Sequence, residues 1–273
     1  MNSKKILITG GSGFIGSHVC RRLLDEGNHV TLVDRYFNDR NELLQSCLSH
    51  KNCKSVCADI CANDFSSLNF DDFDYIIHAA GVLGVKNVID NPVETLDVNI
   101  IGTANVLKLL ERQKNLKRFV HFSSSEIYGS SADSFSESDN VLQMSLKHIR
   151  GCYAISKLAG EAYTLAYSRK IGIKTTSVRP FNVYGTFRYG INAITSFIDK
   201  ALRGENIVVH GDGSQKRAWC YISDFVEALD RLLQSDLGIP FLNIGNSSMV
   251  VTTLESACNS TIDAYGESLK IED

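Results

Sequence analysis

Three glycines near the N-terminus constrain the fold of this chain more than any other feature. Gly10, Gly13 and Gly16 follow an apolar run at the spacing G-x-x-G-x-x-G, and a helical pattern starts directly after them. A strand that enters a helix through such a turn points several unpaired N–H groups and the positive end of the helix dipole at one place. Glycine leaves room there for a pyrophosphate and for close helix–strand contact. The pattern predicts a phosphate-binding turn in a βαβ unit.

An acidic residue follows the next predicted strand. Residues 30–33 are apolar and end at Asp34, eighteen residues after Gly16. A carboxylate in this position accepts hydrogen bonds from a ribose 2′-OH and repels a 2′-phosphate, which favours NAD over NADP. Arg35 follows directly and weakens that preference.

The composition excludes several classes of protein. With 273 residues the chain can form one large domain, or one domain with a smaller lobe. Its net charge of -3 lacks the basic excess of a nucleic-acid binder and suggests no affinity for anionic membranes. No apolar segment is long enough to span a bilayer and no signal peptide precedes the first strand, so we expect a cytoplasmic protein.

The eight cysteines are expected to be reduced thiols in that compartment. Cys53, Cys57 and Cys61 recur at every fourth residue, but no histidine completes a metal site and the spacing matches no usual zinc pair. We expect them to be small buried thiols, and we expect no metal.

The first half of the chain alternates strands with helices. Apolar strands joined by helices predict an α/β fold, with a doubly wound, mostly parallel, Rossmann-like sheet that binds ligands at its carboxyl edge. The expected strands are residues 6–8, 30–33, 54–58, 75–81, 118–122 and 174–178. The expected helices are residues 39–49, a long one from Pro92, and one from Tyr153 to about residue 170.

Small and polar residues follow the predicted strands at this edge. Asp59, before Ile60, could accept a hydrogen bond from an adenine amino group or be a solvated loop residue. Ala79, Ala80 and Gly81 would let the backbone approach a cofactor, and the Asn99 amide could hold nearby backbone or water. Ser123 to Glu126 end the fifth strand, and His78 within its apolar run is expected to be a hydrogen-bonded core histidine.

The second half is less regular. Residues 130–149 are predicted to be a flexible loop over the site, residues 191–204 a helix, 207–210 a strand, 211–214 a turn and 219–222 extended. Ser223 is expected to cap a helix through residue 234, and residues 241–245 return as a strand. We expect a dinucleotide-binding domain of residues 1–180 plus about 221–245, and a smaller substrate lobe of about 181–220 plus 246–273.

Tyr153 and Lys157 lie four residues apart and therefore on one face of a helix. The Lys157 charge is expected to lower the pKa of Tyr153, so that the phenol can take a proton from a sugar hydroxyl while hydride leaves the same carbon. Lys157 could also hold the ribose of a nicotinamide nucleotide. Ser124 would donate to or relay the proton of that hydroxyl, or simply cap the strand end.

Two further charged residues admit two interpretations each. Glu126 would be an acid or base at a second carbon if burial raised its pKa, or it pairs with Arg150. Arg217 follows the predicted turn at residues 211–214 and would clamp a diphosphate bidentately, or form a surface salt bridge.

In combination these residues resemble the extended short-chain dehydrogenase/reductase family, in particular its NAD-dependent nucleotide-sugar epimerases, dehydratases and decarboxylases. The matching motifs are residues 9–16, 59–60, 78–80, Asn99 with 102–103, S-S-S-E-I-Y-G at 123–129, Tyr153 with Lys157, R-P-F-N-V-Y-G at 179–185, and 211–217. The resemblance implies a catalytic set of Ser124, Tyr153 and Lys157 with Glu126 as a further candidate, and substrate contacts from Ser124, Asn182 and Arg217. It implies NAD contacts from Gly10, Gly13, Phe14, Ile15, Gly16, Asp34, Asp59, Ile60, Ala79, Ala80, Gly81, Asn99, Ser123, Tyr153, Lys157 and Phe181. It also implies a homodimer whose four-helix bundle uses the helices that begin near Pro92 and Tyr153.

The function that these features favour is 4-epimerisation of a nucleotide-activated hexose, similar to UDP-glucose 4-epimerase, through a transient 4-keto sugar. Residues 84–88 with Asn91 and Pro92 look like epimerase-type members. Ser124-Ser125-Glu126 is similar to the loop of nucleotide-sugar decarboxylases and GDP-mannose dehydratases, and many 4-epimerase-like proteins share it. Decarboxylation or 4,6-dehydration through Glu126 is therefore an alternative, although Ser125 stands where one dehydratase group has aspartate. A catalytically silent NAD-binding sensor or scaffold is an alternative of another class. Thr186 replaces a usual proline, and the chain ends at Asp273, before residues that close the sugar site in the family. The expectation is therefore a truncated sequence, a more open site or impaired activity.

Overall fold

The computed structural model describes residues 3–129, 135–139, 141, 150–188, 193–208, 216–246, 251–253 and 271–272. The chain divides into two compact units, Met1–Pro180 with Val226–Ile244, and Phe181–Phe225 with Gly245–Asp273. Most of the loop predicted at 130–149, the turn predicted at 211–214, and residues 191–192 and 209–210 of two predicted elements lie outside the described residues. Within those residues, no helix combines the length and the apolar character needed to cross a membrane.

The described part of the first unit is built on a parallel sheet of seven strands in the order β11-β6-β5-β4-β1-β2-β3. The strands are β1 (Lys5–Thr9), β2 (His29–Asp34), β3 (Cys53–Cys57), β4 (Tyr75–His78), β5 (Arg118–Phe122), β6 (Lys174–Pro180) and β11 (Phe241–Ile244). Ile6 of β1 pairs with both Val30 of β2 and Tyr75 of β4, so β1 is central. The strand order reverses between β1 and β4, which is where doubly wound sheets bind ligands. The predicted fold class is confirmed.

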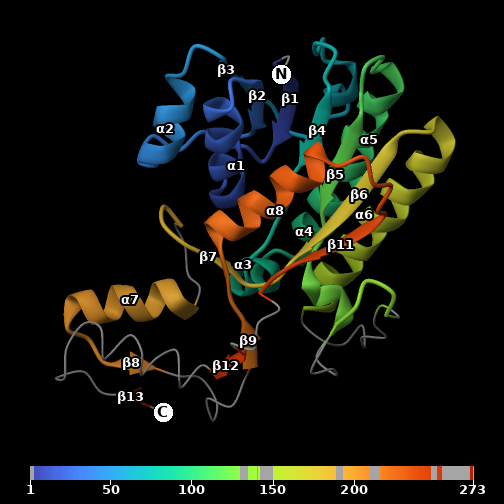
Figure 1. The fold of residues 1–273 in the computed structure, drawn as a ribbon. Helices are drawn as coiled ribbons and strands as arrows, with labels where there is room; N and C mark the ends of the chain where they lie inside the picture. The colour runs from blue at the N-terminus through green and yellow to red at the C-terminus, as the bar shows by residue number, and fades with distance from the viewer. Residues whose placement is uncertain are drawn as a thin grey trace. The chain divides into compact units, whose positions relative to one another are not determined.

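Helices cover both faces of this sheet (Figure 1). One face carries α1 (Phe14–Asp25), α2 (Glu42–Leu48) and the part of α8 (Ile222–Gln234) that belongs to this unit. The other carries α4 (Pro92–Leu96), α5 (Thr103–Leu109) and α6 (Gly151–Ile171), which pack on one another. The core between sheet and helices includes the fully buried Leu7, Val33, Ile76, Val106 and Phe119, alongside the short turns η1 (Phe65–Ser67) and η3 (Leu110–Arg112).

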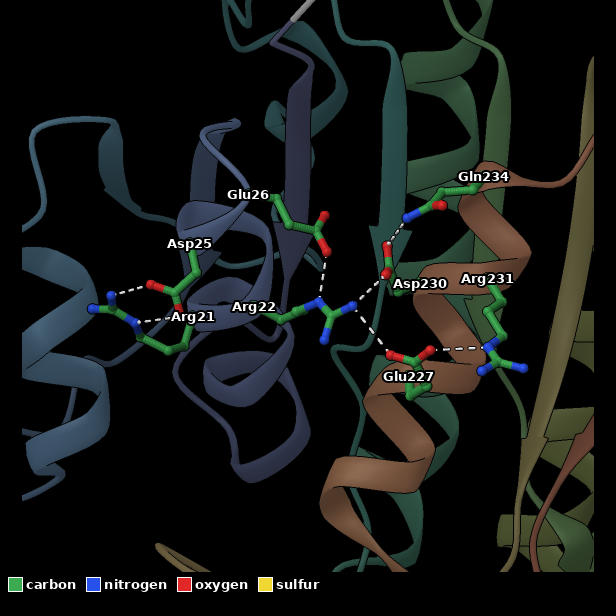
Figure 2. A network of polar contacts seen from close by, with 8 residues as sticks. All are labelled: Arg21, Arg22, Asp25, Glu26, Glu227, Asp230, Arg231 and Gln234. Atoms are coloured by element: carbon green, nitrogen blue, oxygen red, sulfur yellow. Dashed lines mark hydrogen bonds and ion pairs between the residues drawn. The ribbon is translucent and has the colours of Figure 1, made fainter. Parts of the chain in front are cut away.

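Arg22 fixes α8 against α1 (Figure 2). Its Nη2 donates to Asp230 Oδ2 at 2.8 Å and to Glu227 Oε2 at 3.1 Å, and its Nε donates to Glu26 Oε1 at 2.5 Å. Apolar side chains from both helices line a small gap beside it: Val19, Leu23, Val226, Leu229 and Leu233. Helix α1, which starts at the glycine turn, therefore contacts α8 as well as the sheet.

Several predicted elements differ in detail. The helix predicted from Pro92 contains a π-helical turn, η2 (Asp97–Gly102), between α4 and α5. A helix that was not predicted, α3 (Val85–Asp90), follows Gly84, whose φ of 95° few other residues adopt. Ser223 lies inside α8, which begins one residue earlier, so the predicted cap is wrong. Its hydroxyl donates instead to Asp224.

The cysteine prediction also needs correction. Cys57 is exposed and Cys53 is half-buried, because β3 is an edge strand of the sheet, and Cys61, beyond its end, is also half-buried. The cysteines of the described residues are free thiols, and the side chains described form no group that could hold a metal ion.

The second unit contains helix α7 (Ala193–Arg203) and short strand pairs. β7 (Val183–Tyr184) pairs in parallel with β10 (Cys220–Tyr221), β8 (Ile207–Val208) pairs in parallel with β13 (Ile271–Glu272), and β9 (Lys216–Ala218) pairs antiparallel with β12 (Val251–Thr253). The Tyr184 ring contacts those of Trp219 and Tyr221 edge-on.

Candidate active site

The glycine turn at the end of β1 has no room for side chains. A Cβ on Gly10 would lie 2.5 Å from the backbone nitrogen of Ala80, and one on Gly16 would lie 2.3 Å from the carbonyl oxygen of Gly10. Gly10 also has a φ of 73°. Gly13 precedes α1 without a side-chain cap, so the first N–H groups of that helix face outward from the turn. This cradle fits a diphosphate.

Asp34 ends the neighbouring strand β2 and is bonded to the same turn. Its Oδ2 accepts from the backbone nitrogen of Ser12 at 3.1 Å and from Ser12 Oγ at 2.7 Å. The guanidinium of Arg35 turns to Glu94, with Nη1 2.9 Å from Oε1. Arg35, which weakened the predicted preference for NAD, is therefore ion-paired with Glu94.

Asp59 and Ile60 lie beyond the end of β3. Asp59 is exposed and its Oδ1 accepts from the backbone nitrogen of Cys61 at 2.8 Å. Ile60 is buried, and its side chain packs against Gly102. A Cβ added to Gly102 would lie 2.5 Å from Ile60 Cδ1. The Ile60 carbonyl accepts from Asn105 Nδ2 at 3.0 Å.

His78 is a hydrogen-bonded core residue, as predicted. Its Nδ1 lies 2.6 Å from Thr9 Oγ1 and its Nε2 lies 2.9 Å from Thr103 Oγ1. Thr103 gives its own hydrogen to the carbonyl of Asn99 at 2.7 Å, so His78 donates through Nε2 and accepts at Nδ1. Burial lowers the pKa of His78 to about 3, which keeps the ring neutral.

Asn99 holds neighbouring backbone, which confirms that part of its prediction. Its Oδ1 accepts from the nitrogen of Val82 at 2.8 Å, and its Nδ2 donates to the Val82 carbonyl at 3.1 Å and to Ser156 Oγ at 3.0 Å. A Cβ on Gly81 would lie 2.9 Å from both Asn99 Oδ1 and Lys157 Nζ. The end of β4, the π-helical turn and α6 therefore meet at one place.

Ser124, Tyr153 and Lys157 are also brought together there. Ser124 is buried at the end of β5, where its Oγ accepts from the nitrogen of Glu126 at 3.2 Å and caps η4 (Ser125–Tyr128). A hydrogen bond with Ser124 lowers the pKa of Tyr153. Lys157 Nζ donates to the Phe122 carbonyl at 2.9 Å and lies 5.9 Å from the centre of the Tyr153 ring.

The charge state of this group differs from the prediction. Burial, aided by the Glu126 carboxylate, raises the pKa of Tyr153 to about 12 despite the opposing effects of Ser124 and Arg150. Burial also lowers the pKa of Lys157 to about 8. The expected lowering of the Tyr153 pKa by Lys157 is therefore wrong for the protein alone, because burial prevails and the ammonium points to a carbonyl. The phenol keeps its proton at neutral pH.

Glu126 forms an ion pair with Arg150, one of the two alternatives for this residue. Both side chains are about one-third exposed, at 34% and 32%. The carboxylate is close enough to act on the Tyr153 phenol electrostatically. The site thus contains a third ionisable group beside the phenol.

A buried network behind η4 was not predicted. Arg179 Nε and Nη2 donate to Glu161 at 2.9 and 2.8 Å, and Nη1 donates to the hydroxyl of Tyr128, which itself donates to Asn243 Oδ1 at 2.9 Å. The guanidinium carbon also lies 4.9 Å from the centre of the Tyr128 ring and 4.5 Å from the centre of the Phe241 ring. The available signal was Glu161, which follows Tyr153 by two helical turns and therefore shares its side of α6.

The remaining predicted residues belong to the second unit. Phe181 packs closely on Gly245. A Cβ added to Gly245 would lie 2.9 Å from the Cβ of Phe181. Asn182 has a φ of 28°, which asparagine tolerates better than most residues, and its carbonyl accepts from the nitrogen of Cys220 at 3.3 Å. Arg217 is exposed on β9, opposite Thr252 of β12.

A glycine cradle at the switch point of a parallel sheet, beside a Ser–Tyr–Lys group, defines a dinucleotide-binding enzyme of the short-chain dehydrogenase/reductase type. Residues 6–245 match the model of the "NAD dependent epimerase/dehydratase family", and the chain belongs to this family.

Two relatives and one solved structure illustrate the similarity. The chain is 34% identical over 246 residues to UDP-N-acetyl-alpha-D-glucosaminuronate decarboxylase of Bacillus cytotoxicus, covering 89% of this chain and 75% of the relative. It is 35% identical to UDP-glucuronic acid decarboxylase 1 of Danio rerio, covering 89% of this chain but only 57% of that protein. The structure of UDP-glucuronic acid 4-epimerase from Bacillus cereus, in complex with UDP-glucuronic acid and NAD, aligns with a TM-score of 0.88 and 27% identity over 98% of this chain and 85% of the other.

Proposed function

We propose that this chain is an NAD-dependent enzyme that oxidises C4 of a UDP-linked uronic acid to a transient 4-keto sugar. The observation that carries the proposal is the convergence of Ser124, Tyr153 and Lys157 beside Gly81, at the edge that also holds the glycine cradle. The similar proteins support the substrate class, because each is named for a UDP-linked sugar acid.

The residues of this edge fit the cofactor. Ser123 Oγ is buried without a partner among the described residues, next to Ser124 at the end of β5, and so has a hydrogen bond to offer. The cradle would hold the diphosphate, Asp34 the ribose of the adenosine, and Ser123, Tyr153 and Lys157 the nicotinamide end. When bound, NAD supplies the acceptor for a hydride.

Tyr153 is the proposed base for the 4-hydroxyl. Its high pKa in the protein alone means that it must lose its proton as substrate and cofactor bind. Ser124 already lowers that pKa through its hydrogen bond, and it would donate to the developing oxygen. Lys157, with its ammonium beside Gly81, would add a positive charge where negative charge develops.

Decarboxylation is the outcome that Glu126 favours. A uronic acid oxidised at C4 is a β-keto acid, so the electrons of its C5–C6 bond can pass to the C4 oxygen as carbon dioxide leaves. C5 must then receive a proton. Glu126, beside the phenol and paired with Arg150, places a carboxyl group at this site that reversible oxidation alone does not need. Arg150 would also attract the uronate.

4-Epimerisation, which the sequence favours, is the second candidate outcome. It needs only the Ser124–Tyr153–Lys157 group and return of hydride to the opposite sugar face. The similarity to UDP-glucuronic acid 4-epimerase favours it. In both outcomes we propose that Asn182 and Arg217 contact the nucleotide sugar, with Phe181 near the nicotinamide.

Product analysis tests these proposals. The protein would be incubated with NAD and UDP-glucuronic acid and followed by NMR. We expect a UDP-pentose with released carbon dioxide, and no product from Tyr153→Phe. Glu126→Gln should slow formation of the UDP-pentose, because C5 lacks its proton donor, while oxidation at C4 is retained. A 4-epimer as sole product would select the second outcome. Bound NAD with no turnover of UDP-glucuronic, UDP-galacturonic or UDP-N-acetylglucosaminuronic acid would contradict the proposal and favour a silent NAD-binding module.

We further propose a homodimer through the face formed by α4, η2 and α6. These helices pack on one another and expose Val93, Ile101, Ile155 and Tyr163, of which Val93 is 69% exposed. Four apolar side chains on one helical layer support a four-helix bundle with a second copy. Light scattering should give a dimer for the unmodified protein and a monomer for Ile101→Glu with Ile155→Glu. Leu237→Glu, at an exposed leucine outside these helices, should remain dimeric; a monomeric unmodified protein would contradict the proposal.

A further inference from the structure

An ion pair joins the residue after β2 to helix α4, at the edge of the sheet that holds the glycine cradle. Arg35, which follows Asp34, donates from Nη1 to Glu94 Oε1 at 2.9 Å. Glu94 lies in the first turn of α4, 59 positions further along the chain. The Arg35 and Glu94 side chains are 60% and 40% exposed, and an exposed pair of this kind contributes little to stability. Its main structural consequence is the direction of the guanidinium.

The backbone at Arg35 is fixed by the edge strand β3. The nitrogen of Ala58 donates to the Asp34 carbonyl at 2.9 Å. Cys57 Sγ donates to the Arg35 carbonyl at 3.4 Å. The Asp34 carboxylate is bonded to Ser12 of the cradle, so Arg35 follows directly after the residue proposed to hold the adenosine ribose. The Arg35 side chain can therefore turn without any movement of the backbone.

Three carboxylates surround the Arg35 guanidinium. The hydrogen bond to Glu94 raises the pKa of Arg35. The charges of Asp59 and Asp34 act on this pKa in the same direction. Asp34 ends β2, and Asp59 follows the end of the neighbouring strand β3. This corner of the site is therefore negatively charged even with the guanidinium included.

The 2′-position of the adenosine ribose distinguishes the two nicotinamide cofactors. NAD has a hydroxyl there and NADP has a phosphate. Such a phosphate carries about 1.5 to 2 negative charges near pH 7, and a guanidinium binds it through two parallel hydrogen bonds. The Arg35 Nη1 is already bonded to a carboxylate, so this guanidinium is only partly available for such a contact.

We propose that Glu94 is a positioning residue for cofactor selectivity: it engages Arg35, so that this guanidinium does not bind a 2′-phosphate, and thereby keeps the site selective for NAD over NADP. Asp34 repels the phosphate directly, whereas Glu94 acts through Arg35. The selectivity then depends on α4 as well as on the unit that contains the glycines. The inference rests on the cofactor site of the proposed function but not on the reaction proposed there.

Competition between the two nucleotides tests the inference. The full-length protein would be equilibrated at low ionic strength with NAD and an excess of NADP large enough for bound NADP to be detected in the unmodified protein. Bound nucleotides would then be extracted and quantified by chromatography. The ratio of bound NADP to bound NAD should rise about tenfold in Glu94→Gln, because one repelling charge is lost and the guanidinium is released. In an Arg35→Met background, Glu94→Gln should change the ratio by about twofold or less, through the lost charge alone.

Glu111→Gln is the matched control. Glu111 lies on η3, pairs with Lys170 at 2.8 Å and is 41% exposed, so its ion pair resembles that of Glu94 in geometry. This variant should leave the ratio unchanged. Only molecules that hold a nucleotide are counted, so a partial folding defect in any variant does not alter the comparison.

Three results would overturn the inference: an unchanged ratio in Glu94→Gln, an equal rise in Glu111→Gln, or the same tenfold rise of the Glu94→Gln substitution in the Arg35→Met background. Sugar turnover is not measured, so such a failure is distinct from failure of the proposed function. NAD binding without turnover would contradict only the proposed reaction.

Discussion

Replacing Lys157 with methionine should stabilise the cofactor-free protein while abolishing activity. Lys157 is only 6% exposed, and burial lowers its pKa from the usual 10.5 to about 8. At about 1.4 kcal/mol for each pKa unit, keeping this ammonium charged in the folded protein costs about 3 kcal/mol. Methionine removes that cost but also the hydrogen bond to the Phe122 carbonyl, worth about 1 kcal/mol. The net gain at about pH 7 should be about 2 kcal/mol.

The destabilisation by the Lys157 ammonium should decrease as the pH rises. Below pH 8 both folded and unfolded forms hold the Lys157 proton, so the cost is complete. Between about 8 and 10.5 the unfolded form binds more protons than the folded form, so the stability of the unmodified protein rises with pH. From about pH 7 to about pH 9.5 the gap between Lys157→Met and the unmodified protein should shrink by about 2 kcal/mol.

Urea unfolding of the cofactor-free protein at these two pH values measures the effect. Lys114→Met, at an exposed lysine, controls for the loss of one positive charge and should follow the unmodified protein at both values. The claim is that the buried Lys157 ammonium destabilises the folded protein. It would be refuted if the difference in free energy of unfolding between the two proteins did not change with pH, or if the methionine variant were the less stable one at neutral pH.

Two further substitutions probe other parts of the site. Gly16→Ala should weaken NAD binding by about tenfold or more in calorimetry, because its Cβ would lie 2.3 Å from the Gly10 carbonyl oxygen. Gly238→Ala, where an added Cβ has no atom within 4 Å, should bind NAD normally. Equal NAD affinities of the two variants would contradict the role of the cradle. Tyr128→Phe removes the hydroxyl between Arg179 and Asn243, so the free energy of unfolding should fall by about 1 to 3 kcal/mol and kcat should fall more than KM rises; a variant unchanged in both would show that the network does not position η4.

The sequence predicts the sheet and its ligand-binding edge because those features have local signals. The glycine spacing, Asp34 and the Tyr153–Lys157 pair each follow from residues a few positions apart, and the strands are short apolar runs between helices. His78 could be assigned to the core from its apolar neighbours alone. Parallel packing then brings the strand ends together without further information.

Features that depend on distant partners could not be predicted. Arg179 follows a predicted strand, and only the fold shows that Glu161 neutralises its charge and that Tyr128, bonded to Asn243, accepts a hydrogen bond from it. The π-helical turn at Asn99 leaves the apolar pattern of a helix intact, so one long helix was expected. The pKa of Tyr153 depends on burial and on Glu126 across the site, neither of which the spacing to Lys157 reveals.

The most direct test of the account is a single turnover of the NAD-loaded protein with UDP-glucuronic acid, followed by the near-ultraviolet absorbance of reduced nicotinamide. The account predicts a transient rise in the unmodified protein, and none in Tyr153→Phe with NAD still bound. A flat trace in the unmodified protein, with nucleotide sugar and NAD both bound, would contradict the claim that Tyr153, Ser124 and Lys157 support oxidation at C4.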